Sequence, residues 1–260
     1  MSSGPRFDRP PVREVALTVQ FDALQTMQTL TLAPLRVDWS PEYPKLSEVA
    51  PRSPLTRTGA NVEFVSSEAP WPVPRCTFIS ADGNRAIEIQ HDRFGVTWSF
   101  DSDAPSYPGF GALSAELAAR FGQFEALINS SLGVDIQVND VEIEYENHIE
   151  GIRAEELCFG ILSGWAQSTA TLAEPTLDYA GMRFHYCASP SNDNTAILVG
   201  VDTAESDGNG SASTLRLEVQ RDTDSSKVFV ESLSIAHEVL VRRFLEVTTP
   251  AMHSEWGLRA

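Results

Sequence analysis

The sequence predicts an α+β protein with antiparallel sheet in two similar halves, each covered by a long amphipathic helix. Runs of alternating apolar residues follow one another through short turns without regular crossover helices, which favours hairpins over a doubly wound sheet. Two stretches, near 110–132 and 228–247, repeat apolar residues every three or four positions, the period of one helical face. We therefore expect two β-rich halves, 1–133 and 134–260, each closed by one of these helices.

The composition is that of an ordinary folded protein. The 260 residues are 42% hydrophobic and 21% charged, which suffices for a sizeable core. No stretch approaches the roughly 18 consecutive apolar residues that a membrane span needs. The opening MSSGPRFDRPP has no apolar run behind its arginines, unlike a signal peptide. We expect a cytoplasmic protein with no membrane association.

The formal charge of −17 is unevenly distributed, with −4 in residues 1–130 and −13 in residues 131–260. A surface this acidic repels phosphate backbones, so direct nucleic-acid binding is not expected. Solubility is the simplest interpretation of the charge, and docking to a basic protein partner is the alternative. The sequence leaves homo-oligomerisation open.

The first half begins with a predicted strand at 12–21. Residues 22–74 contain eight prolines, which predict an irregular excursion over the surface, anchored by Trp39 and Tyr43. Three strands follow at 75–80, 85–90 and 91–100, and the Asp82-Gly83 dipeptide between the first two is a hairpin signal. Gly133 then stands where a helix C-cap favours glycine.

The second half follows the same order. We expect strands at 141–150, 164–172, 182–187, 196–202 and 214–221, and a short helix at 155–162. The long terminal helix has a candidate cap at Ser225 or Ser226, and Pro250 follows its end. We detect no repeat at the level of individual residues, so duplication of the halves is a hypothesis about architecture.

The sequence lacks the signatures of the commonest enzyme classes. The three cysteines, Cys76, Cys158 and Cys187, are far apart and form no CxxC pair, so buried free thiols are the favoured interpretation. There is no GxxxxGK[ST], no GxGxxG and no GxSxG. We therefore assign no catalytic residue, no metal ligand and no cofactor.

The terminal helix contains His237 and Glu238, which match the first two residues of the zincin motif HExxH. Val241 stands where that motif requires its second histidine, so the metal interpretation of the motif fails. At the border of the apolar stripe, His237 is expected to be half-buried and hydrogen-bonded to a neighbouring loop, with catalysis as the alternative. His237, His253 and one carboxylate would have the ingredients of a metal site if the fold brought them together.

The strand at 141–150 concentrates acidic side chains. Because side chains alternate along a strand, one face carries Val141, Ile143, Tyr145, Asn147 and Ile149. The other face carries Asp140, Glu142, Glu144, Glu146, His148 and Glu150. We expect the apolar face to meet the core and the acidic face to be solvated. Docking to a basic partner and binding of a divalent cation are the alternatives for the acidic face. The candidate binding residues are Glu142, Glu144, Glu146, His148, His237 and Glu238.

Five segments resemble a sporadically distributed family of uncharacterised bacterial proteins. These segments are PPVREVALTVQF, HDRFGVTW, SYPGFGAL, VEIEYENHIE and AHEVLVRRFLEVTT with a terminal WG. The family usually has arginine at the positions of Glu144 and His148, so any role of those arginines does not carry over. The resemblance implies an accessory function in a mobile locus, such as defence or regulation.

The leading hypothesis is a non-catalytic binding or protein-interaction role, so we do not expect an enzyme. One alternative is a metal-dependent enzyme or metal-binding protein that uses the acidic strand and the histidines. The other is a small-ligand pocket between the sheet and the terminal helix.

Overall fold

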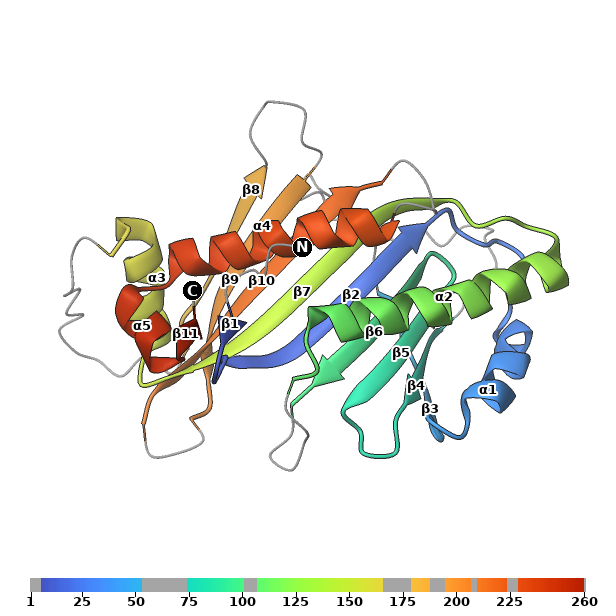
Figure 1. Ribbon diagram of the computed structural model, residues 1–260, viewed down its shortest axis with the longest axis horizontal. Coiled ribbons are helices and arrows are strands. Elements are labelled where there is room, and N and C mark those ends of the chain that lie inside the picture. The colour runs from blue at the N-terminus through green and yellow to red at the C-terminus, as the bar shows by residue number, and fades with distance from the viewer. Residues whose placement is uncertain are drawn as a thin grey trace. The chain divides into compact units, whose positions relative to one another are not determined.

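The computed structural model describes residues 6–52, 74–100, 107–165, 179–187, 195–206, 210–223 and 229–259. Within these ranges, nine strands form one antiparallel sheet in the order β3-β4-β5-β6-β2-β7-β10-β9-β8, and helices pack against it (Figure 1). A second, two-stranded sheet joins β1 (Arg6–Phe7) to β11 (Leu258–Arg259). The predicted α+β class is confirmed.

Eight of the nine described strands of the large sheet agree closely with those expected from the alternating pattern, and β3 was not expected. The strands are β2 (Val12–Phe21), β3 (Lys45–Val49), β4 (Arg75–Ile79), β5 (Arg85–Gln90), β6 (Arg93–Ser99), β7 (Val138–Glu150), β8 (Gly181–Cys187), β9 (Thr195–Ala204) and β10 (Ala212–Asp222). In the sheet, β2 is followed outward by β6, β5, β4 and β3, and β7 is followed outward by β10, β9 and β8. Duplication of the two halves stays a hypothesis.

The helices include both predicted amphipathic segments. They are the short 3-10 helix η1 (Thr29–Leu32), then α1 (Ala33–Trp39), α2 (Phe110–Leu132), α3 (Ala154–Ser163), α4 (Phe229–Val247) and α5 (Pro250–Glu255). Gly133 closes α2 in the left-handed conformation with φ of 66°, as its position predicted. The predicted cap at Ser225 or Ser226 lies outside the described residues.

The chain divides into two compact units. Unit 1 comprises Met1–Val15, Ile143–Gln220 and Ser234–Ala260, and unit 2 comprises Ala16–Glu142 and Arg221–Leu233. The division expected near residue 133 stays a prediction.

The core of unit 2 lies between α2 and the sheet. The ring centroid of Phe94 lies 5.6 Å from that of Phe121 and 5.4 Å from that of Phe124, and Phe21 lies 5.9 Å from Phe124. Phe229, at the start of α4, adds a ring 5.4 Å from Phe121. The four-residue period of α2 therefore places its aromatic side chains on the sheet, as the pattern predicted.

The proline-rich stretch is more regular than expected. Residues 29–32, 33–39 and 45–49 form η1, α1 and β3, so the prediction of an irregular excursion was wrong there. Pro34 falls in the first turn of α1, where its missing N–H leaves no hydrogen bond unmade. The predicted anchors are confirmed, because Trp39 is 1% exposed and Tyr43 is fully buried.

The core of unit 1 includes the terminal helix and both ends of the described chain. The ring of Phe244 on α4 lies 5.7 Å from Phe7 and 5.4 Å from Trp256. Thr249 caps α5 by accepting a hydrogen bond from the Met252 N–H. The terminal helix is therefore a core element, as its apolar period predicted.

A tight turn ends α3 where the sequence predicted that a strand would begin. Gly164 and Trp165 both have positive φ values, 60° and 59°, and the Trp165 N–H donates to the Gly160 carbonyl over 2.7 Å. The indole Nε1 of Trp165 also donates to the Val247 carbonyl at the end of α4 (3.1 Å). The prediction of a strand from Gly164 was therefore wrong at its start, and residues 166–172 lie outside the described residues.

Candidate functional site

The acidic strand β7 alternates as predicted, but two carboxylates of its acidic side are buried. Val141 and Ile143 are fully buried on the core side. On the opposite side, Glu142 is 5% exposed and Glu144 is 6% exposed. The expectation of a solvated face was therefore wrong for these two carboxylates. Buried carboxylates require polar partners, and both have them.

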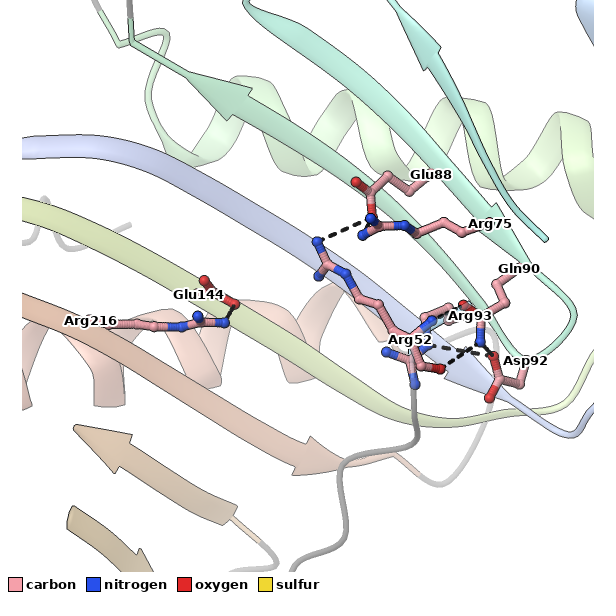
Figure 2. A network of polar contacts seen from close by, with 8 residues as sticks. All are labelled: Arg52, Arg75, Glu88, Gln90, Asp92, Arg93, Glu144 and Arg216. Carbon is pink, nitrogen blue, oxygen red and sulfur yellow. Dashed lines mark hydrogen bonds and ion pairs between the residues drawn. The ribbon is translucent and has the colours of Figure 1, made fainter. Parts of the chain in front are cut away.

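Glu144 is neutralised by an arginine of β10. Arg216 Nη2 lies 2.5 Å from Glu144 Oε2 (Figure 2). A carboxylate oxygen of Glu218 lies within 4.8 Å of one of Glu144. Burial alone would lower the pKa of Arg216, but Glu144, Glu218 and Glu146 together raise it. Within unit 1, a guanidinium thus supplies the positive charge that a bound cation would otherwise supply.

Glu142, in unit 2, is satisfied by an amide. Gln20 Nε2 on β2 donates to Glu142 Oε2 over 2.8 Å. The two residues are 122 positions apart, so the sequence pattern of β7 alone gave no sign of this partner.

The histidines do not join the buried carboxylates. His148 Nε2 lies 2.8 Å from Glu150 Oε1 on its own strand. The His237 ring lies 5.9 Å from that of Tyr145, which alternation places on the other side of β7 from Glu144. Among the described residues, no histidine belongs to a group of three close metal-ligating side chains. The hypothesis of a metal site that uses the histidines with the acidic strand is therefore not favoured by this geometry.

His237 is half-buried, as expected, while Glu238 beside it is exposed. Burial lowers the pKa of His237 to about 4, so its imidazole is neutral at neutral pH. His253 lies elsewhere in unit 1, with its Nε2 2.7 Å from the Thr248 hydroxyl oxygen.

A second polar network in unit 2 joins Arg52 and Arg75 to side chains of β5 (Figure 2). Gln90, which is fully buried, donates to the Arg52 carbonyl (2.9 Å) and to Asp92 Oδ1 (2.9 Å), and its Oε1 accepts from the Arg52 N–H (2.8 Å). Glu88 Oε2 lies 3.5 Å from Arg52 Nη2 and 3.2 Å from Arg75 Nη1. These side chains have protein partners, which indicates a structural role.

A pocket of about 460 Å³ opens in unit 2 beside α2. Its lining comes from the chain after α1, the β4–β5 hairpin, β6 and α2, namely Glu42, Asp82, Asn84, Arg85, Trp98, Pro108, Ala112, Leu113, Glu116, Ala119, Arg120 and Gln123. Pro108, Ala112 and Ala119 are exposed and supply apolar surface, whereas Trp98 and Leu113 are almost fully buried beneath it. The volume lies within the range of about 300–1,000 Å³ typical of small-molecule sites.

Two charged groups of the pocket are held firmly by neighbours. Glu116 accepts a hydrogen bond from the Tyr43 hydroxyl and lies 3.4 Å from Arg85 Nη1. Burial, followed by the Glu116 carboxylate, raises the pKa of Tyr43 well above its ordinary value, so the phenol remains a donor. Arg120 lies 2.6 Å from Glu42 Oε2 and stacks over the rings of Trp39 and Tyr43.

Arg85 is the more accessible guanidinium of this pocket. Its side chain is 42% exposed, whereas that of Arg120 is 12% exposed. Burial alone would lower the pKa of Arg85, but Glu116, Tyr43 and Asp82 raise it. The pocket thus combines apolar surface with the Arg85 guanidinium, which is accessible to a ligand.

Sequence reasoning missed this pocket. Glu116 and Arg120 are four residues apart on one helix and resemble an ordinary surface pair. The only local signals were Trp39 and Tyr43, which were predicted as anchors, and the Asp82-Gly83 turn. Cys76 and Cys158 are buried free thiols, as predicted, and burial raises the pKa of Cys76 to about 11. The Cys187 side chain lies outside the described part.

No family model and no curated protein matches the chain. In the described part of the chain, none of the helices has the length and apolar character needed to cross a membrane.

Proposed function

We infer that this protein is a non-catalytic binding protein that holds a small polar molecule in the pocket beside α2. The observation that carries this proposal is the half-exposed guanidinium of Arg85 on the wall of a pocket with apolar lining. Ligand sites typically combine apolar surface with a few convergent polar groups. This pocket is lined by α2. It therefore differs from the pocket between the sheet and the terminal helix that was expected as an alternative from the sequence.

Acid–base chemistry is less well supported because the candidate groups are already engaged. Glu144 is paired with Arg216, and His148 lies against Glu150. His237 lies against Tyr145, and burial lowers the pKa of its imidazolium form to about 4. A divalent cation at β7 would have to compete with the Arg216 guanidinium, so a metal-dependent function ranks below binding.

The hypothesis of a basic protein partner is weakened, because it relied mainly on the acidic face of β7. Glu142 and Glu144 are buried and paired, so they offer little charge to an approaching surface. A cytoplasmic location and an accessory role in a mobile defence or regulatory locus accompany the proposal. Both rest on the sequence, the second on its resemblance to the sporadically distributed bacterial family.

The test is retention of small molecules by variants that fill the pocket. The purified protein is incubated with a metabolite extract, desalted, denatured and analysed by mass spectrometry. Ala119→Trp should fill the pocket and abolish retention, because Ala119 is an exposed lining residue on α2. Ala126→Trp is the matched control, since Ala126 is exposed on the same helix outside the lining. Equal retention by both variants, or none by the parent, would refute the proposal.

A further inference from the structure

The exposed charges at the pocket are of both signs. Arg85 has five N–H donors, and one of its nitrogens lies 3.4 Å from Glu116 Oε2. The side chain of Glu42 is 57% exposed, although one of its oxygens contacts Arg120. A ligand can therefore reach a cationic group and an anionic group in the same pocket.

Asp82 adds a second accessible carboxylate. Its Oδ1 accepts hydrogen bonds from the Ser80 hydroxyl (2.5 Å) and the Asn84 N–H (3.2 Å). These two bonds lower the pKa of Asp82, so the group stays ionised. Asp82 is exposed, and both of these hydrogen bonds are accepted by Oδ1. The Asp82 carboxylate can therefore accept a hydrogen bond from a ligand.

This mixture of charges selects against ligands of a single sign. A purely anionic ligand at Arg85 would also meet the carboxylates of Asp82 and Glu42. A purely cationic ligand at those carboxylates would meet Arg85 and Arg120. A molecule that carries one charge of each sign would be attracted by both sets, because hydrogen bonds to charged groups are stronger than neutral ones.

We propose that the pocket beside α2 binds a zwitterionic α-amino acid. The carboxylate of the ligand accepts hydrogen bonds from Arg85, and its ammonium group lies toward Asp82 and Glu42. The exposed apolar side chains of Pro108, Ala112 and Ala119 contact the ligand's side chain. This inference rests on the proposed binding function and adds the chemical class of the ligand.

The experiment measures thermal shift and calorimetric affinity with a panel of free L-amino acids. At least one amino acid should raise the melting temperature with its concentration. Its N-acetyl derivative, which lacks the ammonium charge, and its amide, which lacks the carboxylate, should each bind about tenfold more weakly or worse. If either derivative binds as well as the free amino acid, the dipolar assignment is wrong.

Two variants locate the binding. Arg85→Gln should abolish the shift, because it removes the guanidinium that donates hydrogen bonds to the ligand's carboxylate. Arg242→Gln, at an exposed position on α4, should leave the shift unchanged. Binding that survives Arg85→Gln would overturn the assignment of the site.

The two proposals can fail separately. If no free amino acid binds at millimolar concentration while Ala119→Trp still removes compounds retained from the extract, the pocket function stands and the zwitterion inference fails. If Ala119→Trp also changes nothing in the extract experiment, both fail.

Discussion

At the scale of single residues, the Arg216–Glu144 pair stabilises the interior of unit 1. Arg216→Ala would leave Glu144 buried beside Glu218 without its positive partner. We expect a loss of about 3 kcal/mol in the free energy of unfolding, the low end of the range for broken buried pairs, because Arg216 is partly exposed. Chemical denaturation measures this loss.

The same variant tests how the strand responds to metals. Mg²⁺, Ca²⁺ or Zn²⁺ should not raise the melting temperature of the parent, where Arg216 already neutralises Glu144. Ca²⁺ should raise it in Arg216→Ala, and adding Glu144→Gln to that variant should remove the response. A metal-dependent rise in the parent that Glu144→Gln abolishes would instead identify the strand as a metal site.

His237 makes stability depend on pH. Its folded pKa of about 4 lies below the ordinary value of 6.5. Between about pH 4 and pH 6.5, the unfolded chain therefore binds a proton at this residue that the folded protein does not bind. The contribution is fully present above pH 6.5 and is lost as the pH falls toward 4, at up to about 1.4 kcal/mol per pH unit.

The measurement is urea unfolding at pH 7 and pH 5. His237→Gln should reduce the difference in stability between the two conditions. His185→Gln, at an exposed position on β8, should leave it unchanged. If the difference is the same in His237→Gln as in the parent, burial of a neutral imidazole is not its cause.

At the scale of elements, α3 contains a glycine that packs directly against the Trp165 ring. A Cβ at Gly160 would lie 2.4 Å from the Trp165 ring. Gly160→Ala should therefore displace Trp165 and break its hydrogen bond to Val247, lowering stability, although alanine normally stabilises a helix by up to about 1 kcal/mol. Gly122→Ala, on α2 with open space around it, should show that normal gain. Thermal denaturation of both variants gives the two signs, and a gain for Gly160→Ala would contradict the packing of Trp165.

At the scale of the whole molecule, the terminal helix holds both ends of the described chain. Phe244→Ala would remove a ring that contacts Phe7 and Trp256, and we expect a loss of about 3–5 kcal/mol in the free energy of unfolding. Glu238→Ala, on the exposed face of the same helix, should cost well under about 1 kcal/mol. A small effect of Phe244→Ala on the unfolding midpoint would mean that the helix is peripheral.

The fold was predictable where the pattern is local. The alternation of β2 and β7 and the helical period of α2 and α4 are read within one segment, and glycine at position 133 marks a helix end. The proline-rich stretch was wrongly predicted to be irregular. Proline is excluded from helix interiors, but a helix accepts it in the first turn, as at Pro34 of α1.

The polar sites could not be predicted because their partners are distant in sequence. Alternation placed Glu142 and Glu144 away from the core side, but their burial depends on Gln20 and Arg216, which are 122 and 72 positions away. The pocket likewise depends on Glu116 meeting a tyrosine 73 positions away. A single sequence has no signal for such pairings.

The β1–β11 pair has a mechanical consequence. Arg6 lies opposite Arg259, and Phe7 lies opposite Leu258, so residues 6 and 259 form the outer end of a short antiparallel ladder. A force that pulls these two residues apart would load the backbone pairs one after another rather than all at once. A protein stretched between residues 6 and 259 would therefore lose the β1–β11 pairing first and at low force.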